Sequence, residues 1–97
     1  MNEKEQYRTI TVYHDYFEKF FAEQRQKVKN KIIWTLKLIE EVKQVPETYL
    51  KHLAGTDGLY EIRVQSGSDI FRIFCFFDEG QLIVHGFHKV HLYQLSV

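Results

Sequence analysis

The sequence predicts an α+β fold, in which an N-terminal strand and a helical hairpin pack on a mostly antiparallel sheet of about four strands. The first observation is a change in apolar periodicity, from every second residue near position 10 to every third or fourth residue between positions 24 and 43. The second is a set of three apolar runs after position 58, separated by short turn sequences. With 97 residues, the chain is expected to form one domain (1–97) with a flexible segment at 1–6.

The first strand and the first helix are predicted from residues 8–23. Ile10 and Val12 alternate with threonines, as in a half-buried strand. From Asp15 onward, aromatic side chains recur at helical spacing, and the Asp15 carboxylate can accept hydrogen bonds from the first backbone N–H groups of a helix. We therefore expect a strand over 8–13 and a helix over roughly 15–23.

A longer helix is predicted over residues 24–43, because its apolar positions form one stripe: Val28, Ile32, Leu36, Ile39 and Val42. Pro46 ends this run and can open a short third helix, since a proline at the first helical position loses no hydrogen bond. Tyr49, Leu50 and Leu53 would give that helix an apolar side, and we expect it to end near residue 54.

The three later apolar runs, 59–65, 69–77 and 81–87, predict an antiparallel meander. Turn residues separate them, including the segment 78–80, which we interpret as structural only. The middle run should form a central strand, and its one basic residue, Arg72, shares a face with apolar side chains. Arg72 therefore needs a partner or a ligand.

Composition narrows the class of protein. The 13 basic and 13 acidic residues cancel, so only a local excess of positive charge can attract a polyanion. The single cysteine, Cys75, excludes an internal disulfide and lies in an apolar run where a buried thiol is common. The sequence lacks an apolar stretch of roughly 18 residues and a signal peptide, so we expect a cytoplasmic protein that does not enter a membrane. It also lacks glycine-rich nucleotide motifs and CxxC pairs, and no cofactor is expected.

Positive charge gathers on the polar side of the predicted long helix. The segment from position 25 to position 43 contains six basic residues and only two acidic residues, Glu40 and Glu41. Lys27 and Lys31 are our candidates for contacts with an RNA backbone. The alternative is a solvated lysine-rich face without a ligand.

Basic residues of the predicted sheet are the candidates for catalysis. Arg63 and Arg72, together with His88 and Lys89 after the last run, could converge on a phosphate. Guanidinium groups bind phosphate bidentately and stabilise the extra charge of its transition state. RNA carries its own nucleophile, the 2′-OH, so such a site needs no metal. The alternatives are a cross-strand salt bridge for Arg63 and a structural role for Arg72.

Other candidates have weaker signals. Lys51 would close the third helix, where the helix dipole alone also favours a cation. Tyr60 could stack on a base, although an aromatic residue on a sheet is more often part of the core. His85, His88 and His91 are spaced by three, but the period of a strand argues against their convergence on a metal. A proton-transfer role for one histidine is favoured over a metal site, and a surface histidine without a role stays open.

Several motifs follow one another in the second half of the chain. They read Leu53-Ala-Gly55, Gly58-Leu-Tyr-Glu-Ile-Arg-Val64, Ile70-Phe-Arg-Ile-Phe74 and His85-Gly-Phe87, followed by Lys89. In this order they resemble the bacterial RelE/HigB toxin family, in particular its phage Gp49-like branch. The resemblance covers about residues 8–89, and it implies a RelE-like fold.

The resemblance also implies a function: the toxin of a type II toxin–antitoxin pair, a metal-free endoribonuclease that cuts messenger RNA, in most members on the ribosome. Its partner would be an antitoxin, often a helix-turn-helix DNA-binding protein. Arg63, Arg72 and Lys89 match basic positions of the family, and His88 lies in the same cluster. Gln65 stands where relatives often carry another arginine, and we keep it as a polar RNA-binding candidate.

The end of the sequence departs from the family pattern. Residues 90–97 are short and hydrophobic, where relatives usually continue with a segment rich in lysine and threonine. A second hypothesis is therefore a weakened or inactive relative that acts by binding proteins, either as an antitoxin-binding module or as a ParE-like gyrase inhibitor. A third is pairing of an exposed sheet edge with a second copy of the chain, as in a homodimer.

Overall fold

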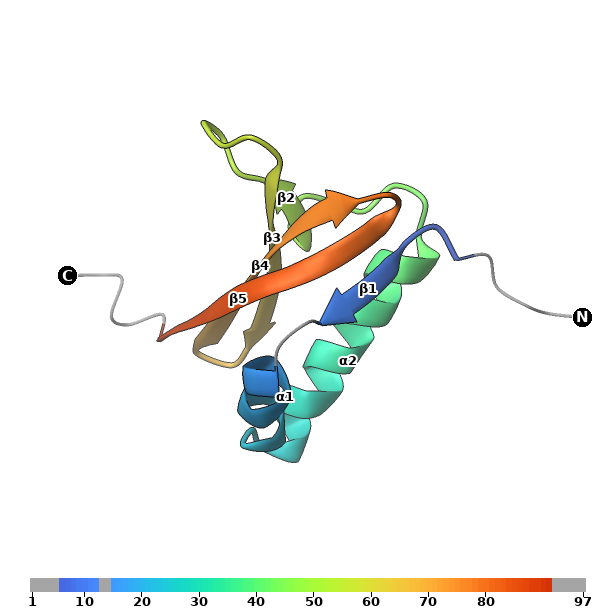
Figure 1. Ribbon diagram of the computed structural model, residues 1–97. Helices are drawn as coiled ribbons and strands as arrows, with labels where there is room; N and C mark the ends of the chain where they lie inside the picture. Colours follow the sequence, from blue (N-terminus) through green and yellow to red (C-terminus); the bar gives the residue numbers. More distant parts are fainter. Residues whose placement is uncertain (1–5, 13–14, 92–97) are drawn as a thin grey trace, which may run out of the picture.

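The protein folds into two helices packed on a five-stranded sheet (Figure 1). The structure, a computed structural model, describes residues 6–12 and 15–91, and within these the side chains of all but residues 16, 85 and 87–91. In chain order the elements are β1 (Thr9–Val12), α1 (Asp15–Ala22), α2 (Gln26–Glu41), β2 (Leu50–His52), β3 (Leu59–Ser66), β4 (Asp69–Asp78) and β5 (Gln81–His91). The predicted α+β class is confirmed. Among the described residues, no helix is long and apolar enough to cross a membrane.

The strands lie in the order β1-β5-β4-β3-β2. β1 pairs with β5 in parallel, and the other neighbouring pairs are antiparallel. The meander expected from the three late apolar runs is therefore present, with β4 at its centre. A two-residue turn joins β4 to β5, and both of its residues, Glu79 and Gly80, have positive φ angles, as the twist of a tight hairpin favours.

The prediction of a third helix is wrong. The segment predicted to form it contains β2 instead, which is the fifth strand of the sheet. After Pro46 the chain makes a single turn, in which Tyr49 N donates to the Pro46 carbonyl at 2.9 Å, and then extends as β2. The free edge of β3 offers backbone hydrogen bonds there, and β2 takes them with Leu50 opposite Ile62. Apolar residues at 49, 50 and 53 fit either a helical turn or a short strand, so tertiary pairing decided the outcome.

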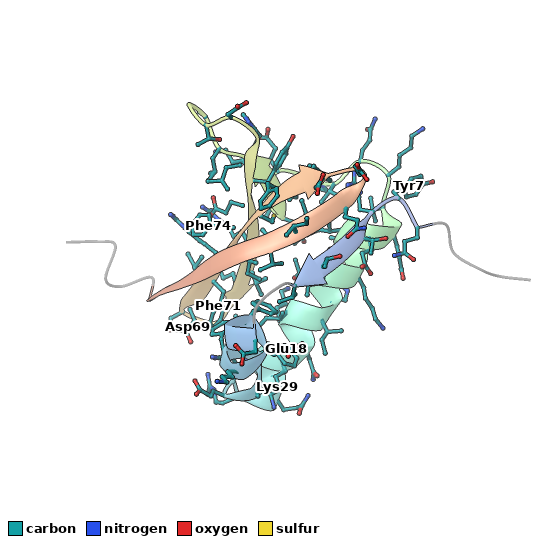
Figure 2. All side chains as sticks on the ribbon, in the orientation of Figure 1. Tyr7, Glu18, Lys29, Asp69, Phe71 and Phe74 are labelled. Atoms are coloured by element: carbon teal, nitrogen blue, oxygen red, sulfur yellow. The ribbon has the colours of Figure 1, made fainter. Side chains whose placement is uncertain are left out.

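The core lies between the two helices and one face of the sheet. The buried stripe of α2, with Val28, Ile32 and Ile39, packs with Phe17 and Phe20 of α1. From the sheet, alternate residues of three strands enter this core: Ile62, Val64, Phe71, Ile73, Cys75, Leu82 and Val84. Phe71 has no exposed surface, and Figure 2 labels it beside α1. Each large apolar side chain buried in this way stabilises the fold by roughly 1.5–3 kcal/mol.

Arg8, just before β1, fastens the N-terminal strand to the end of α2. Its Nη1 donates to the carbonyl oxygens of Ile39 at 2.8 Å and Val42 at 2.7 Å, and its Nη2 donates to that of Lys43 at 2.7 Å. The last turn of α2 contains no basic residue of its own. Arg8 therefore supplies the positive charge and the donors that the exposed carbonyl groups of a helix C-terminus lack.

Replacing Arg8 by alanine should destabilise the fold. Three charge-assisted hydrogen bonds at one helix end are lost, and we expect a decrease of about 1–3 kcal/mol in the free energy of unfolding, measured with urea. Arg25→Ala is the matched control, because Arg25 is exposed and makes no side-chain capping bond. Equal urea midpoints for the two variants would show that the Arg8 contacts contribute nothing to stability.

The buried thiol of Cys75 should make the folded protein less stable at high pH. Burial raises the pKa of its thiol from 9.0 to about 12. The unfolded chain releases this proton above pH 9 while the folded protein retains it, so the folded state is progressively disfavoured between pH 9 and 12. We expect wild-type protein to lose more stability than Cys75→Ala over this range, measured by urea unfolding at a series of pH values. If the free energy of unfolding fell equally with pH in the two proteins, the raised pKa of the Cys75 thiol would be contradicted.

Candidate functional site

Two arginines and a glutamate meet on the sheet face opposite the helices, which we call the arginine face (Glu61, Arg63 and Arg72). Alternation along β3 and β4 directs these side chains away from the core that Ile62 and Ile73 enter. Arg63 and Arg72 lie directly opposite each other in the β3–β4 register. Glu61 Oε2 lies 3.1 Å from Arg72 Nε and 3.7 Å from Arg63 Nη2.

Glu61 makes this pairing of two cations tolerable. Like charges directly opposite on a sheet repel, and the shared carboxylate offsets that repulsion. Glu61 is only 7% exposed, whereas the side chains of Arg63 and Arg72 are 43% and 36% exposed. Arg72 Nε and Glu61 Oε2 are both buried and lie close together, but the N–H group does not point at the oxygen well enough for a hydrogen bond. Their contact is therefore an ion pair. One carboxylate cannot neutralise two guanidinium groups, so one positive charge remains.

The salt-bridge alternatives for the two arginines therefore have support in the structure. Arg72 makes a diagonal cross-strand ion pair with Glu61, and Arg63 makes an ion pair with Glu61 along its own strand. These contacts position the arginines without covering them, because more than a third of each side chain faces solvent. A structural role and a binding role are compatible here.

Lys51 on β2 adds a third cation. It pairs with Glu61 in the β2–β3 register and is exposed. No helix forms around residue 51, so the helix-dipole explanation for this lysine is wrong. Lys51, Glu61 and Arg63 line a hollow of about 240 Å³ with Glu47 and Thr48.

Two further hollows continue from this one towards α2, and together the three form what we call the basic groove. The middle hollow, of about 360 Å³, lies between Lys31, Arg63 and Gln65. The last, an open groove of about 510 Å³, lies between Lys27, Lys31, Trp34 and Gln65. The structure thus brings Lys27, Lys31 and Gln65 into one concave surface with Arg63.

His88 and Lys89 are placed by their backbone alone. Both lie in β5, where the register sets His88 opposite Arg72 and Lys89 opposite Phe71. Their side chains, and those of His85 and His91, lie outside the described part of the structure. The catalytic expectations for His88 and Lys89 and the proton-transfer and metal interpretations of the histidines stay predictions.

Tyr60 is not brought to the arginine face. It packs against the core, and its ring meets those of His52 at 5.2 Å and Phe77 at 5.0 Å, both edge to face. Its register partner is the buried Cys75, on the helix side of the sheet. This is the packing role that the sequence analysis left open for Tyr60.

Two residues of this region escaped the sequence analysis. No role was predicted for Glu61, although its place two residues before Arg63 could have suggested a counter-ion. Trp34 was overlooked altogether, and it is 48% exposed beside Lys31. Its position outside the apolar stripe of α2, three residues after a lysine, was a usable signal.

A second concave surface lies across the molecule's helices. An apolar groove of about 350 Å³ opens between β1, α1 and α2, lined mainly by Val12, Phe17, Phe21, Ile33 and Leu36. Ile33 is 41% exposed there. None of these residues lines the basic groove.

The arginine face and the basic groove together suit a polyanion. Guanidinium groups held on a rigid sheet can bind a phosphate bidentately, and lysines along an adjoining groove can follow a charged backbone. This excess of positive charge is local, since the whole chain has a formal net charge of zero at pH 7. A neutral protein has no overall attraction for nucleic acid, so the local excess of positive charge at the arginine face and in the basic groove would have to provide it.

Comparison with known proteins gives one match. A search of curated proteins and a search of solved structures found no significant match. Residues 19–92, which include all of α2 and the strands of the arginine face, match the family described as phage-derived protein Gp49-like. The chain therefore belongs to the Gp49-like family, a branch of the RelE/HigB-like toxins.

Proposed function

We propose that this protein is the toxin of a type II toxin–antitoxin pair and that it acts as an endoribonuclease on messenger RNA. The family supports a toxin with an antitoxin as its partner. The observation that carries the nuclease is the arginine face, where Arg63 and Arg72 share the single carboxylate of Glu61 and keep exposed N–H groups. Its position at one end of the basic groove gives an RNA backbone a path to it.

The proposed reaction uses the RNA as its own nucleophile. The 2′-oxygen attacks the adjacent phosphorus and loses its proton to a base, while the bond from phosphorus to the 5′-oxygen breaks and that oxygen gains a proton. The products are a 2′,3′-cyclic phosphate and a 5′-hydroxyl, and no metal is needed. Arg63 and Arg72 would stabilise the charge on the phosphate oxygens in the transition state. We assign proton transfer to His88 and Lys89: Lys89 matches a basic position of the family, and an imidazole such as that of His88 can accept and release a proton at neutral pH, although His88 is not the residue expected at its position in the family.

We further propose that cleavage takes place on the translating ribosome. The hollows of the basic groove are open, so charge alone would hold free RNA loosely and in many registers. In-line attack needs a fixed backbone geometry, which contributes several orders of magnitude to the rate. A messenger held by the ribosome supplies this geometry.

A second candidate function is protein binding without catalysis, as an inert antitoxin-binding module or a gyrase inhibitor. The apolar groove beside Ile33 and Leu36 favours it, because exposed apolar surface suits a protein partner better than RNA. The neutral overall charge is also less typical of a nucleic-acid enzyme.

Expression of the protein in a bacterial host tests the nuclease. Induced wild-type protein should arrest growth and produce new messenger RNA 5′ ends in phase with codons, and Arg72→Ala should reduce these cuts by about 100-fold or more, since it removes a donor to the transition state. Arg25→Ala is the matched control, because this exposed arginine lines no part of the basic groove and should cut like wild type.

Two results would contradict this proposal, one its site and the other its reaction. Cuts that persist in Arg72→Ala would remove the arginine face from the reaction. Growth arrest without new 5′ ends would instead support the protein-binding function. Because Arg72→Ala leaves Glu61 with one fewer partner, its folding is checked by circular dichroism, and Arg72→Lys provides a variant that keeps the charge but loses bidentate geometry.

A further inference from the structure

Trp34 is an aromatic side chain that the core does not use. It is the only tryptophan in the sequence, and it is 48% exposed. The residues that α2 buries are Val28, Ile32, Thr35 and Ile39, so Trp34 lies off the packed stripe. The exposed part of the ring is available to a ligand, and because a single exposed aromatic residue is ordinary, its neighbours decide whether it marks a site.

The ring of Trp34 is held in place by two neighbours. Tyr49 packs against it edge to face, with 5.7 Å between ring centres. Lys31 Nζ lies over the ring, 4.8 Å from its centre. These contacts fix the ring at the surface and put a cation beside it.

Trp34 lines the open groove of about 510 Å³ at the α2 end of the basic groove. Lys27 and Lys31 supply positive charge there, and Asn30 and Gln65 supply amide groups. Gln26 Nε2 donates to Asn30 Oδ1 at 2.8 Å, which orients the Asn30 amide. Lys31 and Gln65 also line the middle hollow with Arg63, so this end of the groove is continuous with the arginine face.

We propose that Trp34 is a stacking platform for an unpaired nucleobase of a single-stranded RNA. The phosphates flanking that base lie against Lys27 and Lys31, and the same strand continues along the groove to Arg63. Aromatic faces beside cations are how proteins hold single strands without reading sequence, because every base has a π-face. The proposal deepens the proposed nuclease function and rests on it for the identity of the ligand.

The chemistry of the groove favours RNA over a peptide. An acidic peptide would use the lysines but would gain little from a flat, rigid aromatic ring bordered by amides. A nucleotide uses all three features at once, through stacking, phosphate contacts and hydrogen bonds to base edges. The apolar groove on the other side of α2 is the better surface for a protein chain.

The sole tryptophan makes the test direct. Wild-type protein is titrated with a 2′-O-methyl hexaribonucleotide, which the proposed reaction cannot cleave, while tryptophan emission is recorded. Stacking should quench this emission. An abasic oligonucleotide of equal length and charge should quench it much less, since it offers phosphates alone.

Variants measure the contribution of the ring. Affinity for the same oligonucleotide, labelled with fluorescein and followed by anisotropy, should fall about 5- to 150-fold in Trp34→Ala, the range for loss of one stacked base. Trp34→Phe should retain most of the affinity. Ile33→Ala is the matched control, because Ile33 is similarly exposed on α2 but lines the apolar groove, and it should bind like wild type.

Several outcomes would overturn the proposal: equal quenching by the abasic strand, an unchanged affinity of Trp34→Ala, or quenching by a glutamate-rich peptide but not by RNA. The last would make this end of the groove a protein-binding surface. Failure of the nuclease is seen separately, because quenching by uncleavable RNA together with no new messenger 5′ ends in cells would leave Trp34 as an RNA-binding residue of a protein that does not cut.

Discussion

The coverage of only one sheet face by helices is the constraint on which the rest of the structure depends. α1 and α2 bury the alternate residues of β3, β4 and β5 that face them, Phe71 and Ile73 foremost. The period of a strand then sends the intervening residues to the other face, with no further choice. Glu61, Arg63 and Arg72 lie on that uncovered face for this reason. The packing that stabilises the domain thus also displays its charged residues on a rigid support.

The arginine face is a compromise between positioning and neutralisation. Glu61 holds Arg63 and Arg72 next to each other, although direct opposition of two cations is unfavourable. The same carboxylate removes part of the positive charge that a phosphate would meet. With Lys51 in register opposite Glu61 and Glu47 lining the same hollow, three cations face two carboxylates, and the balance remains positive. A fixed and incompletely neutralised cluster is what an anion site needs, because its donors are already oriented before the anion arrives.

Most of the fold could be predicted from the sequence, because its elements carry strong local periodicity. The stripe of α2 and the alternation of the late strands depend only on neighbouring residues. The segment after Pro46 was predicted wrongly, because its apolar residues suit a helical turn as well as a strand and only the free edge of β3 decides between them. Arg72 could also be singled out from the sequence, since an arginine in an apolar central strand is conspicuous, whereas Arg63 was a candidate because it matches a basic position of the family. Glu61 as their shared counter-ion and Trp34 as a groove residue required three-dimensional placement.

The length of β2 connects the site to α2. β2 pairs with β3 from Tyr60 to Ile62, and Arg63 N donates to the Tyr49 carbonyl at 2.9 Å, so among the described residues the edge of β3 beyond Arg63 has no neighbouring strand. Residues of α2 and of this open edge line the same hollows, with Lys31 and Trp34 on one side and Gln65 on the other. A longer β2 would fill this space and separate the lysines from the arginine face. The short strand that the sequence analysis took for a helix therefore sets the shape of the basic groove, and it does so by where it stops.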